Sequence, residues 1–301
     1  MRKLRSWIKA FRLRTLPLAL ASIFMGSILA ISTHSYNSKV IILAIVTTLF
    51  LQILSNLAND YGDGVKGTDN KNRIGPERSV QSGEITAKEM RNGIIVFVLL
   101  SLIAGIWLII SSLGNKWILG TLFLMLGVGA IAASIKYTVG KNAYGYSGYG
   151  DLSVFIFFGP VAVLGTCYLA SKSINLWSIL PAISMGLFSS AVLNINNMRD
   201  MENDAESGKN TFALILGYKY AKFYHLIIII TAMSLLLAYS IITYESLWQF
   251  IYILIFPIII KDIISINKII DKSMLDPFLK KLALSTFTIS VLFGVGILLG
   301  S

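Results

Sequence analysis

The stretch VIILAIVTTLFLQILSNLANDYGDGVKGTD, residues 40–69, joins a long apolar run to a polar segment that contains three carboxylates. Its first part, residues 40–58, has nearly the roughly 20 apolar residues that a helix needs to cross a hydrocarbon core. Because backbone polar groups in lipid must be satisfied within the segment, a transmembrane helix is predicted here. Asp60, Asp63 and Asp69 follow at its end. Acidic side chains near the hydrocarbon core are energetically costly, and where they occur they usually have a function.

The rest of the chain repeats this apolar pattern. Of 301 residues, 55% are apolar and only 14% are charged, whereas soluble domains carry about 25% charged residues. Eight further apolar runs lie near residues 12–32, 93–113, 117–136, 152–170, 177–198, 223–243, 247–266 and 282–300. These runs do not alternate with period two, which argues against a β-barrel. The sequence therefore predicts an all-α, multi-pass membrane protein, a single domain over residues 1–301 with nine transmembrane helices.

The basic residues are distributed very unequally between the two sides of this topology. Of 26 Lys and Arg, only Lys39, Lys116 and Lys172 fall on one side, and the other 23 fall on the side of the N-terminus. The positive-inside rule then predicts a cell membrane protein with a cytoplasmic N-terminus and an outer C-terminus. The net charge of +11 is interpreted as a topology signal and a contact with anionic lipid, not as a nucleic-acid site.

The acidic residues lie on the same side as the basic ones. Of 15 Asp and Glu, 14 are on the predicted cytoplasmic side, and Glu245 is the exception. Two loops on that side are long and polar, from about residue 59 to 92 and from about residue 196 to 222. Chemistry is therefore predicted at this face of the membrane.

The two polar loops begin with similar sets of residues, each an asparagine followed by two aspartates. The sets are Asn56, Asp60 and Asp63, and Asn196, Asp200 and Asp204. At 100° per helical residue the first set spans about 60° and the second about 80°, so each is predicted to share one helix face. The repeat suggests two related halves, about 12–140 and 151–270, with the ninth helix at 282–300 added.

Four carboxylates that face one another would repel and take up protons unless a cation lies between them. Oxygen ligands of this kind suit Mg²⁺, which completes its coordination with water and phosphate oxygens. Basic residues surround the acids: Lys66, Lys71, Arg73, Arg78 and Lys209. Arginine in particular favours bidentate contacts with phosphate. Since no GxxxxGK[ST] motif is present, the pattern predicts a Mg²⁺-bound diphosphate with an apolar tail rather than a hydrolysed nucleotide.

Three segments resemble the signature segments of the UbiA-type intramembrane prenyltransferases. They are NLANDYGDGVKGTD (56–69), RIGPERSVQSGEIT (73–86) and NNMRDMENDAESGKNT (196–211), and GYGDLSVFIFFGPVAVLGTCYL (148–169) extends the resemblance to nearly the whole chain. The resemblance is strongest to the branch that prenylates 1,4-dihydroxy-2-naphthoate in menaquinone biosynthesis. The later acid at Asp69 departs from the NDxxDxxxD form of the 4-hydroxybenzoate enzymes, which favours the naphthoate branch and leaves Asp69 without a role.

The resemblance implies a UbiA-type helical bundle and a specific reaction. Mg²⁺ held by Asp60, Asp63, Asp200 and Asp204 would bind a polyprenyl diphosphate, and the allylic C–O bond would ionise. The dihydroxynaphthoate ring would then attack the allylic cation, with loss of diphosphate and CO₂, to give demethylmenaquinone. The basic residues expected to share the diphosphate charge are Lys66, Arg73, Arg78 and Lys209.

Other polar residues near these loops are weaker candidates. Asp151, at the start of the fifth span, is predicted to position a phenol or act as a base. Tyr137 is predicted to bind substrate by shielding a cation or orienting the ring, although an interfacial aromatic belt would also place tyrosines there. Four asparagines complete the predicted substrate-binding set: Asn56, Asn59, Asn196 and Asn197.

Two alternatives to naphthoate prenylation stay open from the sequence. A different acceptor, such as 4-hydroxybenzoate, homogentisate or another lipid, would need the same metal and diphosphate chemistry. A secondary transporter would use intramembrane acids as an ion path, but it would place them near the middle of its spans. Here the acids lie at span ends, which favours an enzyme. The sequence does not indicate the prenyl chain length or the oligomeric state.

Overall fold

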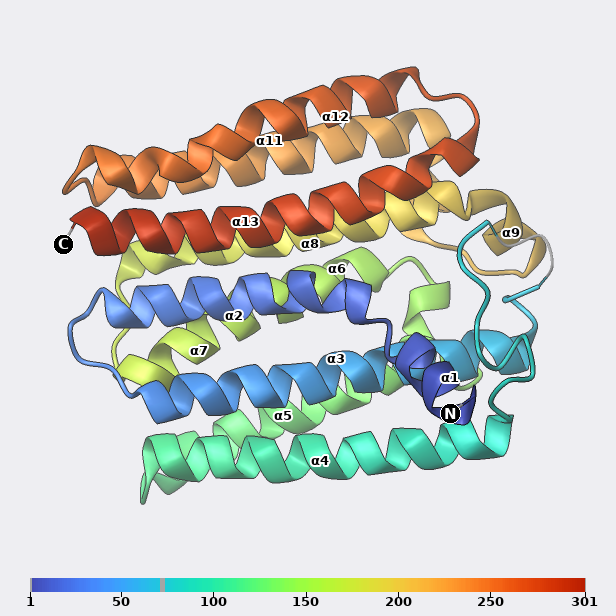
Figure 1. Ribbon diagram of the computed structural model, residues 1–301, viewed down its shortest axis with the longest axis horizontal. Helices are drawn as coiled ribbons and strands as arrows, with labels where there is room; N and C mark the ends of the chain where they lie inside the picture. Colours follow the sequence, from blue (N-terminus) through green and yellow to red (C-terminus); the bar gives the residue numbers. More distant parts are fainter. Residues whose placement is uncertain (1, 71–73, 301) are drawn as a thin grey trace.

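The computed structural model describes residues 2–70 and 74–300 and is almost entirely helical (Figure 1). Within these residues nine helical segments are long and apolar enough to cross a membrane, and each coincides with one apolar run of the sequence. The prediction of an all-α, multi-pass membrane protein with nine transmembrane helices is confirmed.

The α-helices are α1 (Arg2–Phe11), α2 (Leu16–Ile31), α3 (Ser38–Lys66), α4 (Ala87–Leu113), α5 (Trp117–Lys136), α6 (Gly150–Ile156), α7 (Ala162–Ser171), α8 (Ile179–Arg199), α9 (Met201–Glu206), α10 (Phe212–Leu216), α11 (Tyr218–Ile242), α12 (Phe256–Lys268) and α13 (Asp276–Gly300). Short 3-10 turns cover Leu13–Thr15, Tyr144–Tyr146, Leu176–Ser178 and Lys272–Leu275, and a π-helical turn covers Phe157–Val161. A longer 3-10 segment of nine residues, Leu247–Ile255, forms the first part of the eighth span.

Two of the spans are interrupted for local reasons. The amphipathic helix α1 is separated from α2 because Arg12 has a φ of 49°, a left-handed conformation that non-glycine residues rarely adopt. The fifth span consists of α6, a π-helical turn and α7, and Pro160 lies in that turn. Proline lacks an N–H and clashes with the preceding helical turn, so a local departure from α-helix is expected at this residue.

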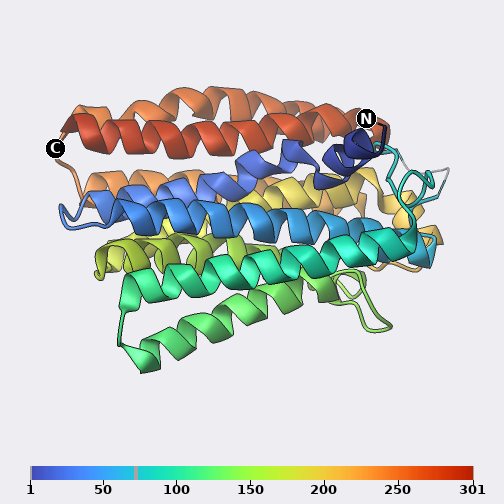
Figure 2. The same ribbon diagram turned by 60° about the horizontal axis from the view of Figure 1, so that its bottom comes forward.

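The long helices run side by side, and the polar segments gather at one end of the bundle. Figures 1 and 2 both place the N-terminus, α9 and the loop that follows α3 at this end, with the C-terminus at the opposite end. The two acid-rich segments, which are far apart in the sequence, therefore lie at the same end of the bundle.

Helix α8 is the central helix of the bundle, and α5 is peripheral. In the apolar part of the α8 span 61% of the residues are buried inside the protein, compared with 0% for α5. Helix α8 packs against α11, α6, α13 and α2. The second acid set is thus attached to the most enclosed helix, whereas α5 presents its apolar surface outward.

Gly26 allows α2 and α7 to approach closely, because a Cβ atom at this position would lie 2.4 Å from the carbonyl oxygen of Val163. Small residues at such crossings are a common way for membrane helices to pack. We expect Gly26→Ala to separate the helices and to lower the free energy of unfolding by roughly 1–3 kcal/mol. Thermal unfolding in detergent measures this effect. Gly129→Ala is the control, since a Cβ there meets no atom within 4 Å, and equal midpoints for both variants would contradict the described packing.

Candidate active site

The first acid set lies on the C-terminal part of α3, at the polar end of the bundle. Asn56, Asp60 and Asp63 are all buried, with at most 3% of each residue exposed. The helix ends at Gly67, whose φ of 76° is the left-handed conformation that commonly terminates helices. The predicted placement of this set on one helix end is confirmed.

The second acid set is divided between two helices. Helix α8 ends at Arg199, Asp200 lies at the junction, and Asp204 belongs to α9. The prediction of one continuous helix for this set is therefore wrong at Asp200. Asp200 has φ −91° and ψ 6° at this junction, and its carboxylate is bound by the side chain of its neighbour, Arg199.

Lys209 links the two acid sets. Its Nζ lies 3.9 Å from Oδ2 of Asp63 and 3.6 Å from Oδ1 of Asp204. Burial opposes the charge of this ammonium, but the two carboxylates outweigh burial and raise the pKa of Lys209 above its usual value. Burial also raises the pKa of the Asp204 carboxyl to about 6, although Lys209 opposes that shift. Asp63, Asp204 and Lys209 thus form one buried, charge-coupled group.

Tyr146 holds the Asp63 carboxylate from the other side. Its hydroxyl donates to Oδ1 of Asp63 at 2.8 Å and lies 2.6 Å from the hydroxyl of Thr68. The Nζ of Lys66 lies 3.8 Å from the centre of the Tyr146 ring, a cation–π contact. The orientation of Asp63 therefore depends on an aromatic side chain from the loop between α5 and α6.

If Asp63 is the metal ligand that the sequence predicts, Tyr146→Phe should lower activity by about 10-fold or more, the usual cost of losing a partner that orients such a ligand. The variant removes the hydroxyl that binds Asp63 and keeps the ring beneath Lys66. The initial rate of the catalysed reaction is the measurement. Tyr220→Phe is a suitable control, because Tyr220 is 62% exposed on α11. Equal rates for the two variants would show that the Tyr146 hydroxyl does not orient Asp63.

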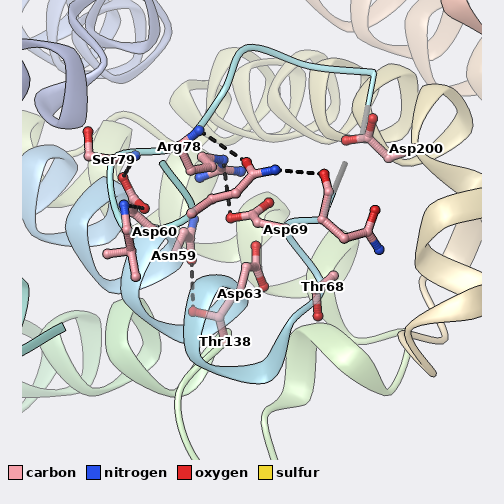
Figure 3. Close-up of polar contacts among 12 residues, drawn as sticks. Asn59, Asp60, Asp63, Thr68, Asp69, Arg78, Ser79, Thr138 and Asp200 are labelled. Carbon is pink, nitrogen blue, oxygen red and sulfur yellow. Dashed lines mark hydrogen bonds and ion pairs between the residues drawn. The ribbon is translucent and has the colours of Figure 1, made fainter. Parts of the chain in front are cut away.

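Asp60 binds the loop that precedes α4. Its carboxylate oxygens accept the backbone N–H groups of Ser79 at 3.2 Å and Val80 at 3.1 Å (Figure 3). Both oxygens of this predicted metal ligand are thus engaged by the loop. Figure 3 shows Asp60, Asp63 and Asp69 in one part of this view and Asp200 to one side of them.

Asp69 has a defined partner in the same loop. Its Oδ2 lies 3.6 Å from Nε of Arg78, and both side chains are largely buried. Gln81 connects the two halves of the loop, since its Oε1 accepts from the Arg78 N–H and its Nε2 donates to the carbonyl of Asn70. Asp69, left without a role by the sequence, therefore fixes Arg78 at the polar end of the bundle.

Asn56 has a structural use that the sequence did not suggest. Its Nδ2 donates to the carbonyl of Phe11 and to the hydroxyl of Thr15, both at 2.9 Å. These two acceptors flank the left-handed residue Arg12, so Asn56 holds the turn between α1 and α2. Asn56 also lines the cavity described next. Binding of substrate by Asn56 therefore stays a prediction beside this structural use.

A cavity of about 420 Å³ begins at this polar end and continues along α3. Polar side chains line one part of it: Arg12, Asn56, Asn59, Asp63, Arg78, Tyr137, Asn196, Asn197 and Lys209. Apolar side chains line the remainder, among them Leu18, Ile23, Ala44, Leu108, Phe123 and Leu126. Asp63 and Ala44 both belong to α3 and are 19 residues apart, which at 1.5 Å per residue corresponds to about 28 Å. The cavity is therefore long, charged at one end and mostly apolar elsewhere, with hydroxyl and amide side chains such as Thr47, Gln52 and Ser134 among the lining residues.

The other predicted residues differ in their relation to this cavity. Asn59, Asn197, Arg78, Tyr137 and Lys209 line it as expected. Asn196 also lines it, although its Oδ1 accepts from Arg199 at 3.0 Å.

Of the predicted residues that the structure describes, five are not among those that line the cavity: Asp60, Asp151, Asp200, Asp204 and Lys66. Lys66 lies over the ring of Tyr146, and Asp151 is buried at the start of α6, where Ser190 binds its backbone carbonyl at 3.0 Å. Lys71 and Arg73 fall outside the described residues.

Tyr146, Arg199 and Arg12 were missed as site residues. Tyr146 is one of several tyrosines in the loop before the fifth span, where an interfacial aromatic belt also accounts for tyrosine. Arg199 resembles the other basic residues on the predicted cytoplasmic side. Arg12 lies in the N-terminal basic segment. The positive-inside rule accounts for the basic residues of that segment without a role in a site. Over residues 2–70 and 74–300, no three His, Cys, Asp or Glu side chains gather closely enough to form a metal site by themselves.

The model of the UbiA prenyltransferase family matches residues 19–273. The chain belongs to the UbiA prenyltransferase family. The resemblance noted in the sequence is thereby confirmed, and the protein is a prenyltransferase by family.

Relatives within the UbiA family match almost the whole chain. The 1,4-dihydroxy-2-naphthoate octaprenyltransferase of Haemophilus influenzae is 45% identical over 99% of this chain and 97% of its own length. The enzyme of the same name from Escherichia coli is 40% identical over 98% of this chain and 96% of its own length. A UbiA homologue from Archaeoglobus fulgidus, solved bound to GPP and Mg²⁺, has a TM-score of 0.64 with 13% identity, covering 95% of this chain and 99% of that one. This last likeness shows that the bundle is a UbiA fold.

Proposed function

We propose that this protein transfers a polyprenyl group from polyprenyl diphosphate to 1,4-dihydroxy-2-naphthoate, in menaquinone biosynthesis. The observation that carries the proposal is the cavity that begins at Asp63 and Lys209 and continues along α3 between apolar side chains. A charged end and a long apolar remainder match the two parts of a prenyl diphosphate. The names of the relatives at 45% and 40% identity support naphthoate as the acceptor rather than 4-hydroxybenzoate or homogentisate.

The donors at the polar end fit a Mg²⁺ ion. Oδ2 of Asp204 is buried and has no hydrogen-bond partner among the described residues. The Lys209 ammonium is the positive charge that Asp63 and Asp204 share in this structure. Two carboxylates suit an ion that takes its other ligands from water and phosphate. The Mg²⁺ in the solved homologue supports this proposal.

We assign Mg²⁺ binding to Asp63 and Asp204, with Asp200 beside them. When bound, the ion would supply positive charge that stabilises the leaving diphosphate. Metal binding by Asp60 stays a prediction, and the structure supports a second use for it, as the residue that holds the loop of Ser79.

The basic residues at the polar end would bind the diphosphate oxygens. Arg12, Arg78 and Lys209 all line the cavity, and arginine binds phosphate through two parallel hydrogen bonds. Lys66 lies outside the cavity lining, so its charge would act from behind the Tyr146 ring. A phosphate contact by Arg73 stays a prediction, since Arg73 lies outside the described residues.

The reaction breaks the allylic C–O bond, and the electron pair leaves with the diphosphate. A ring carbon of dihydroxynaphthoate forms the new C–C bond, and the carboxyl group leaves as CO₂. The product is demethylmenaquinol, the reduced form of demethylmenaquinone. The apolar wall would keep water from the allylic cation, and Tyr137, which lines the cavity, would orient the ring. A role for Asp151 as base or phenol partner stays a prediction, because Asp151 is not among the residues that line the cavity.

We also propose that the polar end of the bundle faces the cytoplasm. Of the 26 Lys and Arg residues, 23 lie on the side of the N-terminus and three on the opposite side. This distribution supports an orientation with the N-terminus inside and the C-terminus outside. The aromatic acceptor would then enter the site from the cytoplasm, while the prenyl tail stays within the hydrocarbon layer of the membrane.

An acceptor panel tests the proposed function. Purified protein in lipid nanodiscs receives labelled polyprenyl diphosphate, Mg²⁺ and one aromatic acid at a time. We expect labelled product with 1,4-dihydroxy-2-naphthoate and none with 4-hydroxybenzoate or homogentisate. Product from 4-hydroxybenzoate alone would contradict the assignment of dihydroxynaphthoate as the acceptor. Absence of product with all three acids would contradict the proposed function.

The raised pKa of Asp204, about 6 against an ordinary 3.8, predicts that Mg²⁺ binding depends on pH. Below pH 6 the folded protein holds a proton at Asp204, and Mg²⁺ must displace it. We expect the half-saturating Mg²⁺ concentration to rise from pH 7 to pH 5, approaching tenfold per unit for one proton. Without Mg²⁺, the same shift makes the free energy of unfolding increase as the pH falls through 6, because the folded state binds more protons.

The Mg²⁺-induced rise of the melting temperature at several pH values measures this dependence. Asp204→Asn serves as the comparison, since it cannot take up the proton. An equally steep pH dependence in that variant would assign the proton to another group.

A further inference from the structure

We propose that Arg199 is a positioning residue that holds the Asp200 carboxylate beside the diphosphate site, and that the ninth span fixes Arg199 through Asp276. This inference rests on the proposed function, because it concerns how Asp200 is presented to Mg²⁺. It adds a role for two residues that the sequence did not single out.

The contact between Arg199 and Asp200 is bidentate. Nε donates to Oδ1 at 2.8 Å and an Nη donates to Oδ2 at 2.7 Å. Such a pair fixes both the position and the plane of the carboxylate, which a single contact does not. Because Arg199 is only 1% exposed, solvent cannot take over these hydrogen bonds. Asp200 is therefore held in one orientation by the residue that precedes it.

Two further contacts hold the guanidinium itself. One Nη donates to Oδ1 of Asn196 at 3.0 Å, within the last turn of α8. The other forms an ion pair with Asp276, the first residue of α13, 77 residues away in the sequence. Arg199 thus joins the end of the central helix to the start of the ninth span.

The charges of this group explain why an arginine is needed. Asp200 and Asp204 are near enough to influence one another electrostatically, and both act on Lys209. A second carboxylate beside this group would repel Asp204 unless it had its own cation. Arg199 supplies that cation, and each oxygen of Asp200 keeps a lone pair that the arginine does not use. The structure therefore presents Asp200 as a fixed and neutralised oxygen donor.

Variants of both residues test the inference. In Arg199→Lys the charge stays but the bidentate geometry is lost, and we expect the half-saturating Mg²⁺ concentration to rise about 10- to 100-fold, the usual cost of losing a partner of a metal ligand. In Asp276→Asn we expect a rise of about two- to fivefold, because the Asp276 side chain is partly exposed. The rate at saturating Mg²⁺ should fall much less than the apparent Mg²⁺ affinity in both variants.

A second readout is independent of catalysis. The Mg²⁺-induced rise of the melting temperature, measured with a non-hydrolysed prenyl diphosphate analogue, should need the same higher Mg²⁺ concentrations. Lys272→Gln is the matched control. It breaks the 2.6 Å ion pair between Lys272 and Glu202, which joins the same two regions of the protein without touching Asp200. We expect wild-type Mg²⁺ dependence in the control.

Asp200→Asn separates this inference from the proposed function. Normal turnover in Asp200→Asn would remove Asp200 from the site and overturn the proposed role of that carboxylate. Loss of turnover in Asp200→Asn, together with normal Mg²⁺ dependence in Arg199→Lys and Asp276→Asn, would overturn only the positioning role. Equal shifts in Lys272→Gln and Asp276→Asn would also contradict it, because they would indicate a general loosening between the α8–α9 junction and the start of the ninth span.

Discussion

Asp63→Asn is expected to lower the turnover of prenyl transfer by about 10²–10³-fold while leaving the protein folded. This is the usual cost of removing one group that stabilises developing charge in an enzyme site. The asparagine keeps the size of the side chain, and its amide oxygen still accepts from the Tyr146 hydroxyl, which now donates at 2.8 Å. The negative charge that would hold Mg²⁺ is lost. Steady-state rates at saturating Mg²⁺, with a melting curve for each preparation, measure the effect.

Asp204→Asn should give a loss of similar size, and the double variant should be little worse than either single one. Residues that act as one unit show such strong non-additivity. Asp262→Asn is the control, since Asp262 pairs with Lys281 at 3.3 Å and is not among the described residues that line the cavity. Near-normal turnover in Asp63→Asn would contradict the assignment of Asp63 to the diphosphate site.

Lys209→Met is expected to be the most destabilising change at the site when Mg²⁺ is absent. It leaves the carboxylates of Asp63 and Asp204 buried together without the ammonium that lies 3.6–3.9 Å from them. Breaking a buried ion pair in this way costs roughly 3–5 kcal/mol. Activity should fall as well, because Lys209 lines the cavity where the diphosphate would bind.

Mg²⁺ should recover part of that lost stability, since a divalent cation can replace the missing positive charge. Melting temperatures of wild type and Lys209→Met, each with a chelator and with excess Mg²⁺, measure both effects. The rise caused by Mg²⁺ should be larger in the variant. Identical melting temperatures of the two proteins in chelator would show that Lys209 does not neutralise the carboxylates.

The fold was predictable because lipid permits few structures. Nine apolar runs had to be helices, and the helix that contains residues 40–58 had to carry Asp60 and Asp63 near its end. The same reasoning placed both acid-rich segments at one end of the bundle. It could not foresee that Arg12 would adopt a left-handed conformation, because that turn is held by Asn56 from another helix.

The pairing of the charged groups was not predictable from spacing. Helical phase predicted that each acid set shares one helix face, and convergence of the four carboxylates required the two faces to meet. In the structure Asp60 binds loop amides and Asp200 binds Arg199. The loop amides reach Asp60 through a tertiary contact, and Arg199, although it adjoins Asp200 in the sequence, is itself held by an ion pair with Asp276, 77 positions away. The spacing of the acidic residues indicates which carboxylates could bind a metal. Their tertiary contacts determine which carboxylate oxygens remain free to do so.

The most direct test of the proposed reaction follows the carboxyl carbon of the acceptor. Purified protein in nanodiscs receives polyprenyl diphosphate, Mg²⁺ and 1,4-dihydroxy-2-naphthoate labelled at its carboxyl group, and released CO₂ and diphosphate are both counted. The proposed function predicts one labelled CO₂ and one diphosphate for each demethylmenaquinol formed, and none of the three after chelation. Diphosphate release without labelled CO₂, or CO₂ release that does not need the prenyl donor, would contradict it.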